Sequence, residues 1–396
     1  MSDWPASLWT PYRSSVIEDP YPMYRSLRAY PGLYPAPSGD WIVTRYSDIR
    51  AVLKDTSFLN GNRLRWLERG ASEFPERYDV FQSILKAVSP FLVFQNGHYH
   101  QALRKFISAE WNTLSIGTVI EENIIHLWPS DSLFDLAPIA MQLPAKVMCD
   151  VMGIPEADFK KLEQLSHKMI MAFDLYLSFR NLSVVKETAN AFLAYFQQLI
   201  EAKEQAPDDS LISKLIRHPL PDGVSRYDLL SNLFFLFISG VETTASLICH
   251  GVWHLSTRDF LPKLAADPTR ISSAVEECLR FDPPAQLVAR YATRDTTIAG
   301  TEIAKGDSLT ICLASANRDE SVYEEADRFS LDRDFSKHLA FSHGAHYCLG
   351  DWLARLEFSA VLSHIVKKKS FRVMSAPVWR PNLSVRSIQS LMVTQT

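Results

Sequence analysis

The sequence predicts a mainly α-helical fold with a small β region. Residues 226–256 contain no proline and form one largely apolar stretch, which as a helix would be about 45 Å long. Residues 110–225 read as mostly helical, with amphipathic stretches and a loop break. Runs typical of strands are short and few. With 396 residues, the chain is long enough for one large domain or two ordinary ones.

The first 60 residues predict short elements separated by turns. A helix is expected to start at 19–22, Asp-Pro-Tyr-Pro, because proline is favoured in the first helical turn. The apolar run 41–43 is a strand candidate after a Ser-Gly-Asp turn. Ser47-Asp48 can cap a further helix, which carries Ile49, Val52 and Leu53.

The middle of the chain predicts successive helices over 138–151, 155–172 and 183–202, followed by a loop at 205–210. The long stretch 226–256 contains Gly240, Glu242 and Thr243. A buried acid beside a hydroxyl can hold and relay a proton. The alternative is that the threonine bonds back to its own helix backbone.

The last third of the chain predicts a helix over 274–280 that Asp282-Pro283-Pro284 ends. Further elements are expected as a strand over 286–290, paired strands over 299–306, a helix over 349–369 and strands over 383–393.

Cys348 lies just after a loop containing Gly344 and just before the helical pattern Leu349, Leu353, Leu356. A cysteine at a helix N-terminus is favoured as a thiolate, because unpaired N–H groups and the helix dipole stabilise negative charge. Such a thiolate is a metal ligand or a nucleophile. A zinc site with His343 and His346 would lack a fourth ligand, and a buried inert cysteine is the remaining alternative.

Composition excludes some classes of protein. The net charge of −4 argues against a nucleic-acid binder. The five cysteines are far apart and form no C-x-x-C pair, which favours a reducing compartment. We expect no signal peptide and no membrane span, because the N-terminus has no basic and apolar run and the strongest apolar run is Leu233–Ile238.

Residues 341–350 resemble the cysteine-ligand loop of the cytochrome P450 superfamily. The pattern F-x-x-G-x-H-x-C-x-G is matched by Phe341, Gly344, His346, Cys348 and Gly350. The resemblance implies that Cys348 is the proximal ligand of haem iron and that Phe341, His346 and Gly350 bind the cofactor. It also shows Ser342 where many members carry glycine.

Other segments resemble signatures of the same family in the same order. The resemblance implies that Gly240 lets a diatomic ligand approach the backbone and that Glu242 and Thr243 deliver protons to bound oxygen. It implies cationic contacts with the haem propionates. It also implies a structural ion-pair network. The propionate ligands are expected to be His100, Arg104 and Arg290, and the network Glu277, Arg280 and Arg318.

The resemblance implies a single cytochrome P450 domain over residues 1–396, with its smaller β-containing part around 30–60 and 286–312 and a long central helix crossing the haem. It further implies a soluble, bacterial-type, cytoplasmic protein that is a monomer and acts in secondary metabolism.

The function implied is a haem-thiolate monooxygenase that inserts one oxygen atom of O2 into a medium-sized hydrophobic molecule. Haem b is the cofactor, and electrons from NAD(P)H arrive through ferredoxin and ferredoxin reductase, or flavodoxin, on the proximal face. Two alternatives stay open. One is a peroxide-driven enzyme, and the other is a non-catalytic haem-thiolate sensor.

The substrate candidates are apolar and aromatic residues spread along the chain. They are Phe91, Phe94, Phe235, Ser239, Leu287, Val288 and Ile388. An anionic group on the substrate is a further hypothesis, based on Arg63, Arg65, Arg69 and Arg180. Asp351 is expected to be a helix-start acid favoured by the dipole, or a residue that makes a ferredoxin-docking face less basic.

Overall fold

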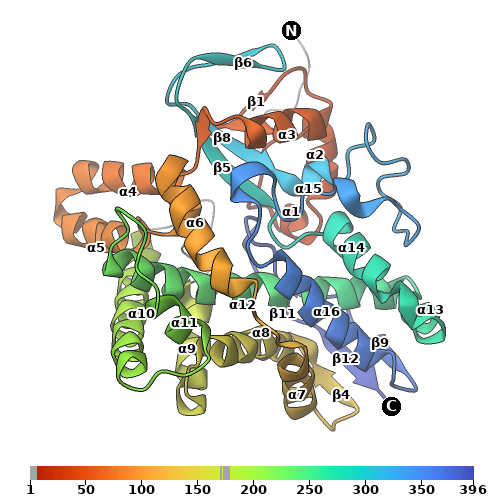
Figure 1. Cartoon of the computed structure of the whole chain (residues 1–396). Helices are drawn as coiled ribbons and strands as arrows, with labels where there is room; N and C mark the ends of the chain where they lie inside the picture. Colours follow the sequence, from red (N-terminus) through yellow and green to blue (C-terminus); the bar gives the residue numbers. More distant parts are fainter. Residues whose placement is uncertain (1–6, 170–171, 173–178) are drawn as a thin grey trace. The chain divides into compact units, whose positions relative to one another are not determined.

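The longest helix in the described part of the chain is α12 (Arg226–Thr257), shown in green in Figure 1. The structure is a computed structural model that describes residues 7–169, 172 and 179–396. Its residues divide into two compact units. Unit 1 consists of Met1–Asn62, Ser130–Ala137 and Ser246–Thr396, and unit 2 consists of Arg63–Pro129 and Pro138–Ala245.

The fold is mainly α-helical with small sheets. The α-helices are α1 (Ser14–Glu18), α2 (Tyr21–Arg28), α3 (Tyr46–Lys54), α4 (Asn62–Glu73), α5 (Tyr78–Val88), α6 (Gly97–Trp111), α7 (Gly117–Leu127), α8 (Leu136–Met152), α9 (Phe159–Met169), α10 (Phe179–Gln205), α11 (Leu211–Ile216), α12, α13 (Leu261–Ala266), α14 (Ile271–Phe281), α15 (Leu313–Ala316) and α16 (Asp351–Ile365). Single 3-10 turns are η1 (Pro75–Arg77), η2 (Leu92–Phe94), η3 (Glu156–Asp158), η5 (Pro268–Arg270), η6 (Phe335–Lys337) and η7 (Gly344–His346).

The strands form four small sheets in unit 1. The largest has the order β1-β2-β8-β5-β3, and only its β2–β8 pair is parallel. The others are β4-β12-β9, β6-β7 and β10-β11. The bounds are β1 (Tyr34–Pro35), β2 (Trp41–Val43), β3 (Phe58–Leu59), β4 (Leu133–Asp135), β5 (Leu287–Ala292), β6 (Thr296–Ile298), β7 (Thr301–Ile303), β8 (Ser308–Cys312), β9 (Phe371–Val373), β10 (Val378–Trp379), β11 (Ile388–Ser390) and β12 (Met392–Gln395).

The five-stranded sheet draws its strands from the two stretches in which the sequence predicted the β region. Its apolar face packs against α3 and α15 in a core that includes Val43, Ile49 and Leu309. Alternation of side chains along β2 and β8 places one face of each strand in this core, and burying the apolar side chains stabilises the pairing.

Unit 2 is built on helices, with α10 beside α5, α9 and α11 (Figure 1). Its core is aromatic. The Phe192 and Phe234 rings stack with centroids 4.5 Å apart, and Phe196 and Phe237 lie 6.3 Å and 5.9 Å from Phe192. Offset ring pairs at these distances stabilise a core beyond the area that they bury.

Several predicted elements are confirmed, with ends that match or differ by a few residues. The helix expected over 226–256 is α12, and the strand expected over 41–43 is β2. The helix expected over 349–369 was too long, because α16 begins at Asp351 and ends at Ile365. Leu356 was wrongly assigned to its apolar face, since that side chain is 37% exposed. The single domain over 1–396 stays a prediction.

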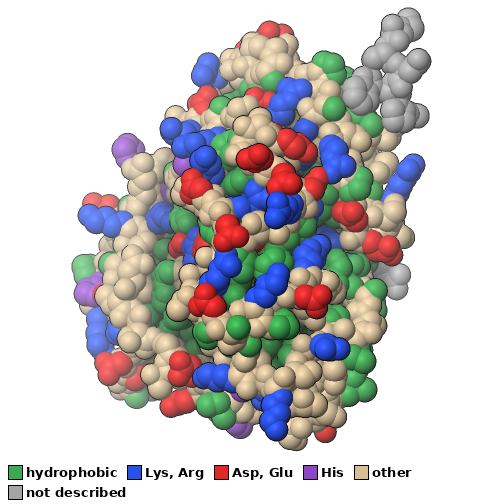
Figure 2. All heavy atoms as spheres, turned by 90° about the vertical axis from the view of Figure 1, so that its right-hand side faces the viewer, with side chains coloured by type: hydrophobic (Ala, Val, Ile, Leu, Met, Phe, Trp, Pro, Cys, Tyr) green, Lys and Arg blue, Asp and Glu red, His purple; other side chains and the backbone are tan. Residues whose placement is uncertain are grey.

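Helix α12 is long and apolar enough to cross a membrane by length and composition, but 78% of its most apolar window is buried inside the protein. A core helix of a soluble protein passes the same test, so α12 gives only weak support for a membrane span. On the face drawn in Figure 2, acidic and basic side chains are interspersed.

Candidate functional site

Cys348 lies in the loop 341–350, which includes η7 and leads into α16; all of it is in unit 1. It stands two residues before Gly350, the N-cap of α16, and its backbone N–H donates to the Phe341 carbonyl at 3.0 Å. Its side chain is exposed, whereas the other four cysteines are buried. None of the five forms a disulfide, and Cys348 is the one whose exposure places it to react or to bind a ligand.

Two residues of this loop have left-handed backbone conformations. Ser342 has a φ of +65° and Gly344 a φ of +76°. Ser342 therefore keeps a left-handed turn at a steric cost that glycine would avoid. At Gly344 a side chain is excluded altogether, because a Cβ atom would lie 2.5 Å from the Leu53 carbonyl oxygen at the end of α3.

Phe341 and His346 are half-buried in the same loop. The Arg355 guanidinium lies 4.4 Å from the centre of the Phe341 ring. Among the residues that the structure describes, no group of three or more His, Cys, Asp and Glu side chains could hold a metal ion. The zinc alternative for His343, His346 and Cys348 thus gains no support.

Arg290 is a buried cation on β5. Its Nη1 donates to the Asn60 side-chain oxygen and, at 2.8 Å, to the Ala289 carbonyl. Burial lowers the pKa of its guanidinium to about 10. No carboxylate of the described residues pairs with it. A buried guanidinium without a carboxylate suits an anionic group of a ligand.

Glu277 and Arg280 form a fully buried ion pair on α14. Arg280 Nε and Nη2 donate to the two Glu277 carboxylate oxygens at 2.7 Å and 2.8 Å. Arg280 also donates to the carbonyls of Asn317 and Ala326, both at 2.9 Å. The pair therefore connects α14 to the segment after α15.

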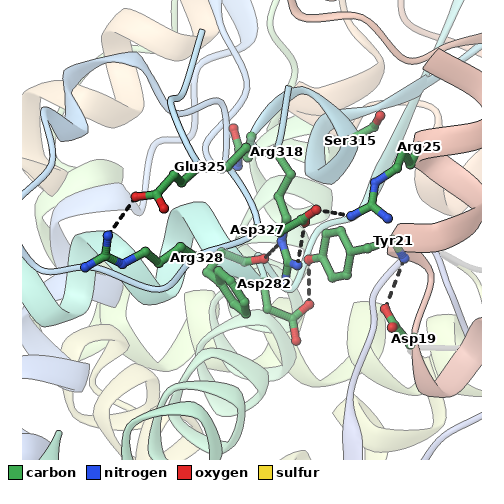
Figure 3. A network of polar contacts seen from close by, with 12 residues as sticks. Asp19, Tyr21, Arg25, Asp282, Ser315, Arg318, Glu325, Asp327 and Arg328 are labelled. Carbon is green, nitrogen blue, oxygen red and sulfur yellow. Dashed lines mark hydrogen bonds and ion pairs between the residues drawn. The ribbon is translucent and has the colours of Figure 1, made fainter. Parts of the chain in front are cut away.

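Arg318 was expected to complete this network, and that expectation was wrong. Figure 3 shows it beside Tyr21 and Asp327. Its Nη1 pairs with Asp327 at 3.2 Å, and its guanidinium lies between the rings of Tyr21 and Phe281. Arg333 takes the expected place, with its Nε 3.6 Å from Glu277 Oε1. Sequence order did not distinguish the two arginines.

In unit 2, Phe235, Ser239, Gly240 and Thr243 lie along one face of α12. All four are partly exposed, whereas every other residue of the helix from 229 to 245 is buried. Glu242 is next to this face and is itself buried. The Thr243 hydroxyl donates to the Ser239 carbonyl at 2.8 Å. The back-bonded alternative for Thr243 is thus present, and it leaves the lone pairs of the hydroxyl oxygen as acceptors.

Gly240 packs against α8. A Cβ atom there would lie 3.1 Å from the Met148 sulfur. His100 and Arg104 share one face of α6, where His100 is buried and Arg104 is half-buried. Burial, followed by the charge of Arg104, lowers the pKa of His100 to about 4. His100 is therefore neutral at neutral pH in this environment.

The predicted substrate residues fall into separate groups. In unit 2, the Phe91 ring stacks on Phe94 at 6.2 Å and lies 4.9 Å from Phe235. In unit 1, Leu287 and Val288 lie on β5 and Ile388 on β11. Val288 packs against the core of the five-stranded sheet.

The predicted arginines give a mixed result. The Arg63 guanidinium lies 5.5 Å from the centre of the Trp66 ring, and Arg69 pairs with Glu73 at 3.9 Å. Arg65 is exposed on α4, and the side chain of Arg180 lies outside the described residues. These arginines do not identify a site for an anionic group.

Comparison with known proteins gives a consistent result. A family model described as Cytochrome P450 matches residues 271–393. The biotin biosynthesis cytochrome P450 of Bacillus subtilis (strain 168) is 31% identical over 395 residues, which cover 96% of this chain and 97% of the relative. The chain belongs to the cytochrome P450 family. Other cytochrome P450 relatives are hydroxylases and monooxygenases, so this chain is an oxidoreductase.

Further similarities extend over nearly the whole cytochrome P450 chain. The vitamin D(3) 25-hydroxylase of Pseudonocardia autotrophica is 31% identical over 401 residues, covering 97% of this chain and 95% of the relative. The structure of P450BioI in complex with a hexadec-9Z-enoic acid ligated acyl carrier protein has a TM-score of 0.87 at 29% identity. It covers 97% of this chain and 100% of that one.

Membership of the cytochrome P450 family implies haem b, and the residues present fit it. Cys348 offers an exposed thiol from a turn in which Gly344 allows no side chain. Arg290 offers a buried cation that no described carboxylate neutralises. A haem propionate would supply the missing negative charge.

Sequence reasoning missed some residues that hold these groups. Asn60 fixes Arg290, and the Leu53 carbonyl sets the position of Gly344. Both contacts join segments more than 200 residues apart, so no local pattern could have shown them. The i, i+4 spacing of Asp351 and Arg355 could have shown their ion pair, since such pairs meet on one helix face.

Proposed function

We propose that this cytochrome P450 binds haem b through Cys348 and inserts one oxygen atom of O2 into a medium-sized hydrophobic molecule. The exposed Cys348 thiol on its constrained turn is the observation that carries the proposal. When bound, haem b would supply the iron at which oxygen is activated, and the Cys348 thiolate would favour cleavage of the O–O bond.

The residues that hold the haem are divided by role. Cys348 is the iron ligand, with Phe341, His346 and Gly350 in the same loop. Arg290 would bind one propionate. His100 and Arg104 on α6 stay predicted propionate ligands. Binding of an anion next to His100 would favour its protonated form.

Glu242 and Thr243 move protons. Glu242 is buried, and a carboxyl group can accept and donate a proton. Thr243 donates to Ser239 and can accept a hydrogen bond at the same time, so its oxygen can receive a proton as its own is passed on. Gly240, Ser239 and Phe235 line the same helix face, on which oxygen and substrate would be bound.

Thr243→Ala tests this assignment. We expect the share of reductant that ends in product to fall about ten-fold or more, because the positioned proton donor is lost. Thr257→Ala is a matched control. It removes the same type of back-bond, from Thr257 to the Trp253 carbonyl at 2.7 Å, at the exposed end of the same helix. If the share of reductant that ends in product is equal in Thr243→Ala and Thr257→Ala, Thr243 is not part of the mechanism.

The electron donor we propose is an acidic ferredoxin with its reductase, or a flavodoxin, that draws on NAD(P)H. Arg50 and Lys54 support this choice. Both are exposed on α3, whose last turn contacts the Cys348 loop at Gly344. After burial, the charges of Arg50 and Lys54 lower the pKa of His343 in that loop. Their charges complement an acidic partner. Exchanging both for glutamate should raise the KM for ferredoxin, most clearly at low salt, and exchanging the exposed Arg372 on β9 should not.

The substrate class rests on the Phe91, Phe94 and Phe235 cluster, which offers aromatic surface to an apolar molecule. A second candidate is an acyl chain carried by an acyl carrier protein, because P450BioI is similar over the whole chain and binds such a partner. A binding-spectrum screen separates the two. Response to free hydrophobic molecules supports the first, and response only to the acyl-loaded carrier protein supports the second.

Two further measurements define the class. A ferrous–CO spectrum of the purified protein tests thiolate ligation. Comparing rates with ferredoxin against rates with hydrogen peroxide tests the peroxide-driven alternative, and the Glu242-Thr243 pair argues for the ferredoxin route. Product formation by either route excludes a non-catalytic sensor. We further propose a cytoplasmic monomer, since the relatives over the full length are bacterial and none of the five cysteines forms a disulfide.

A further inference from the structure

A chain of five polar side chains connects both ends of the Cys348 loop to helices α14 and α16, all within unit 1. Its first member is Tyr347, the residue directly before Cys348. The Tyr347 hydroxyl donates to Asp351 Oδ2 at 2.9 Å, and the same oxygen accepts from Arg355 Nη1 at 2.6 Å. Asp351 and Arg355 face each other across the first turn of α16.

The chain continues from α16 to α14. Arg355 Nε donates to Glu276 Oε1 at 2.5 Å, and Nη2 lies 3.4 Å from Glu276 Oε2. Glu276 Oε2 in turn accepts from His338 Nε2 at 2.7 Å. The other His338 nitrogen accepts from the backbone N–H of Ala340 at 3.3 Å, so this end of the chain fixes the residue before Phe341.

Arg355 is the centre of the chain. One guanidinium bridges two carboxylates and also covers the Phe341 ring at 4.4 Å. The planar fork of arginine can make these contacts at once, whereas lysine offers a single point charge. The side chains of Glu276, Asp351 and Arg355 are 22%, 25% and 29% exposed, so water screens these contacts only in part.

The loop needs support from outside itself. Its own backbone contributes three contacts, from Ser342 to Leu339, from Tyr347 to Gly344 and from Cys348 to Phe341. Ser342 is in a left-handed conformation that is unfavourable for a residue with a side chain. Conformations of this kind persist when surrounding contacts determine them. The five-residue chain supplies contacts at both ends of the loop.

We propose that the chain Tyr347–Asp351–Arg355–Glu276–His338 positions Cys348 as an iron ligand. The proposal deepens the proposed function and rests on it. The five residues touch neither substrate nor oxygen in this role. They hold the backbone on both sides of Cys348, and breaking the chain at any member lets the thiolate move away from its ligating position.

The test uses the holoenzyme and the two ends of the chain. Tyr347→Phe removes one hydroxyl, keeps the ring and should leave the fold intact. Glu276→Gln removes the carboxylate that joins Arg355 to His338. Arg355→Lys keeps the charge and loses the fork. Asp332→Asn is the control, because Asp332 pairs with Arg270 at an exposed position of the same unit. The readouts are the haem midpoint potential and the rate at which the ferrous–CO complex loses its thiolate signature.

We expect the rate of thiolate loss to rise about five-fold in Tyr347→Phe and about ten-fold in Glu276→Gln, as lost charge-assisted hydrogen bonds would give. In the double variant Tyr347→Phe/Glu276→Gln, the rate of thiolate loss should rise by less than the product of the two single increases. The reason is that both substitutions break one connected chain, although the two residues do not touch. Arg355→Lys should resemble Glu276→Gln, and Asp332→Asn should match the wild type.

Two results would overturn the proposal. One is a lower unfolding temperature of the chain variants with an unchanged midpoint potential and unchanged thiolate loss, which is what a merely structural role predicts. The other is strictly multiplicative effects in the double variant. If the wild-type protein itself shows no thiolate signature with CO, the proposed function fails and this inference fails with it, so the two failures are distinguishable.

Discussion

At the scale of single residues, Ser342 shows how the ligand loop tolerates an unusual residue. Its φ of +65° is the conformation that glycine adopts without cost, and its hydroxyl finds no hydrogen-bond partner among the described residues. The loop therefore keeps its turn while storing strain beside Cys348. The contacts of Phe341, Gly344 and Tyr347 hold the backbone around this residue.

Ser342→Gly should raise the free energy of unfolding by about 0.5–1 kcal/mol. Relief of the left-handed strain is worth about 1–2 kcal/mol, and the greater freedom of glycine in the unfolded chain offsets part of it. Urea unfolding measures the change. Ser375→Gly, at an exposed position with no positive φ, should lower stability by a few tenths of a kcal/mol. A loss of stability in both variants would contradict the strain argument.

At the scale of elements, the contact of α12 with α16 depends on the absence of one side chain. A Cβ atom on Gly251 would lie 2.0 Å from the tip of the Phe358 ring, which is fully buried. Glycine costs helix stability, so its place within the last two turns of α12 is explained by this close approach. Helix α16 begins at the ligand loop, so the same contact fixes the helix that follows Cys348.

Gly251→Ala should lower the free energy of unfolding by about 1–3 kcal/mol through overpacking, although alanine is the better helix former. Thermal unfolding of the holoenzyme measures the effect. A second change, Phe358→Leu, should restore part of the stability in the double variant. Gly117→Ala is the control, because nothing lies within 4 Å of its Cβ position. No loss in Gly251→Ala would show that the Phe358 ring can move aside.

The helices and the ligand loop could be predicted from sequence because their signals are local. The absence of proline over 226–256 and the periodic apolar residues define α12, and the spacing of Phe341, His346 and Cys348 defines the loop. Which arginine pairs with Glu277 could not be predicted. Whether Arg318 or Arg333 reaches Glu277 depends on the path of the irregular segment between α15 and η6, which no periodic pattern describes.

At the scale of the whole molecule, a buried polar network around Asp282 joins distant segments of unit 1. Figure 3 shows the Tyr21 hydroxyl directed at Asp282, and the distance is 2.9 Å. Arg386 and His254 also contact this carboxylate, at 2.5 Å and 3.0 Å. The network connects α2, α12, α14 and the segment before β11. Against the cost of burial, the nearby charge of Arg386 and the hydrogen bond from His254 hold the pKa of Asp282 well below its usual value.

This network makes stability fall in acid. Burial lowers the pKa of His250 to about 4 and that of His254 to about 3. The unfolded chain therefore binds protons below about pH 6.5 that the native state does not, and stability decreases as pH falls from 7 to 4. By pH 5, each of the two histidines lowers the free energy of unfolding by about 2 kcal/mol. The stability that the Asp282 carboxylate contributes is lost only below pH 4, as pH falls through its lowered pKa.

Urea midpoints at pH 7, 6 and 5 measure this dependence. His254→Gln keeps a donor for Asp282 and removes the titration, so its midpoint should change less with pH than that of the wild type. His218→Gln, at an exposed position beside Glu110, should follow the wild type. The same pH dependence in all three proteins would show that the buried histidines do not cause the acid sensitivity.

The contact between Gly344 and the Leu53 carbonyl has an evolutionary consequence. Because α3 touches the ligand loop through its backbone, the side chains of α3 that face solvent are free to vary without moving Cys348. Arg50 and Lys54 are such side chains. Recognition of an electron donor can therefore drift, or be redesigned, independently of iron ligation, and one scaffold can be adapted to new donors by surface changes alone.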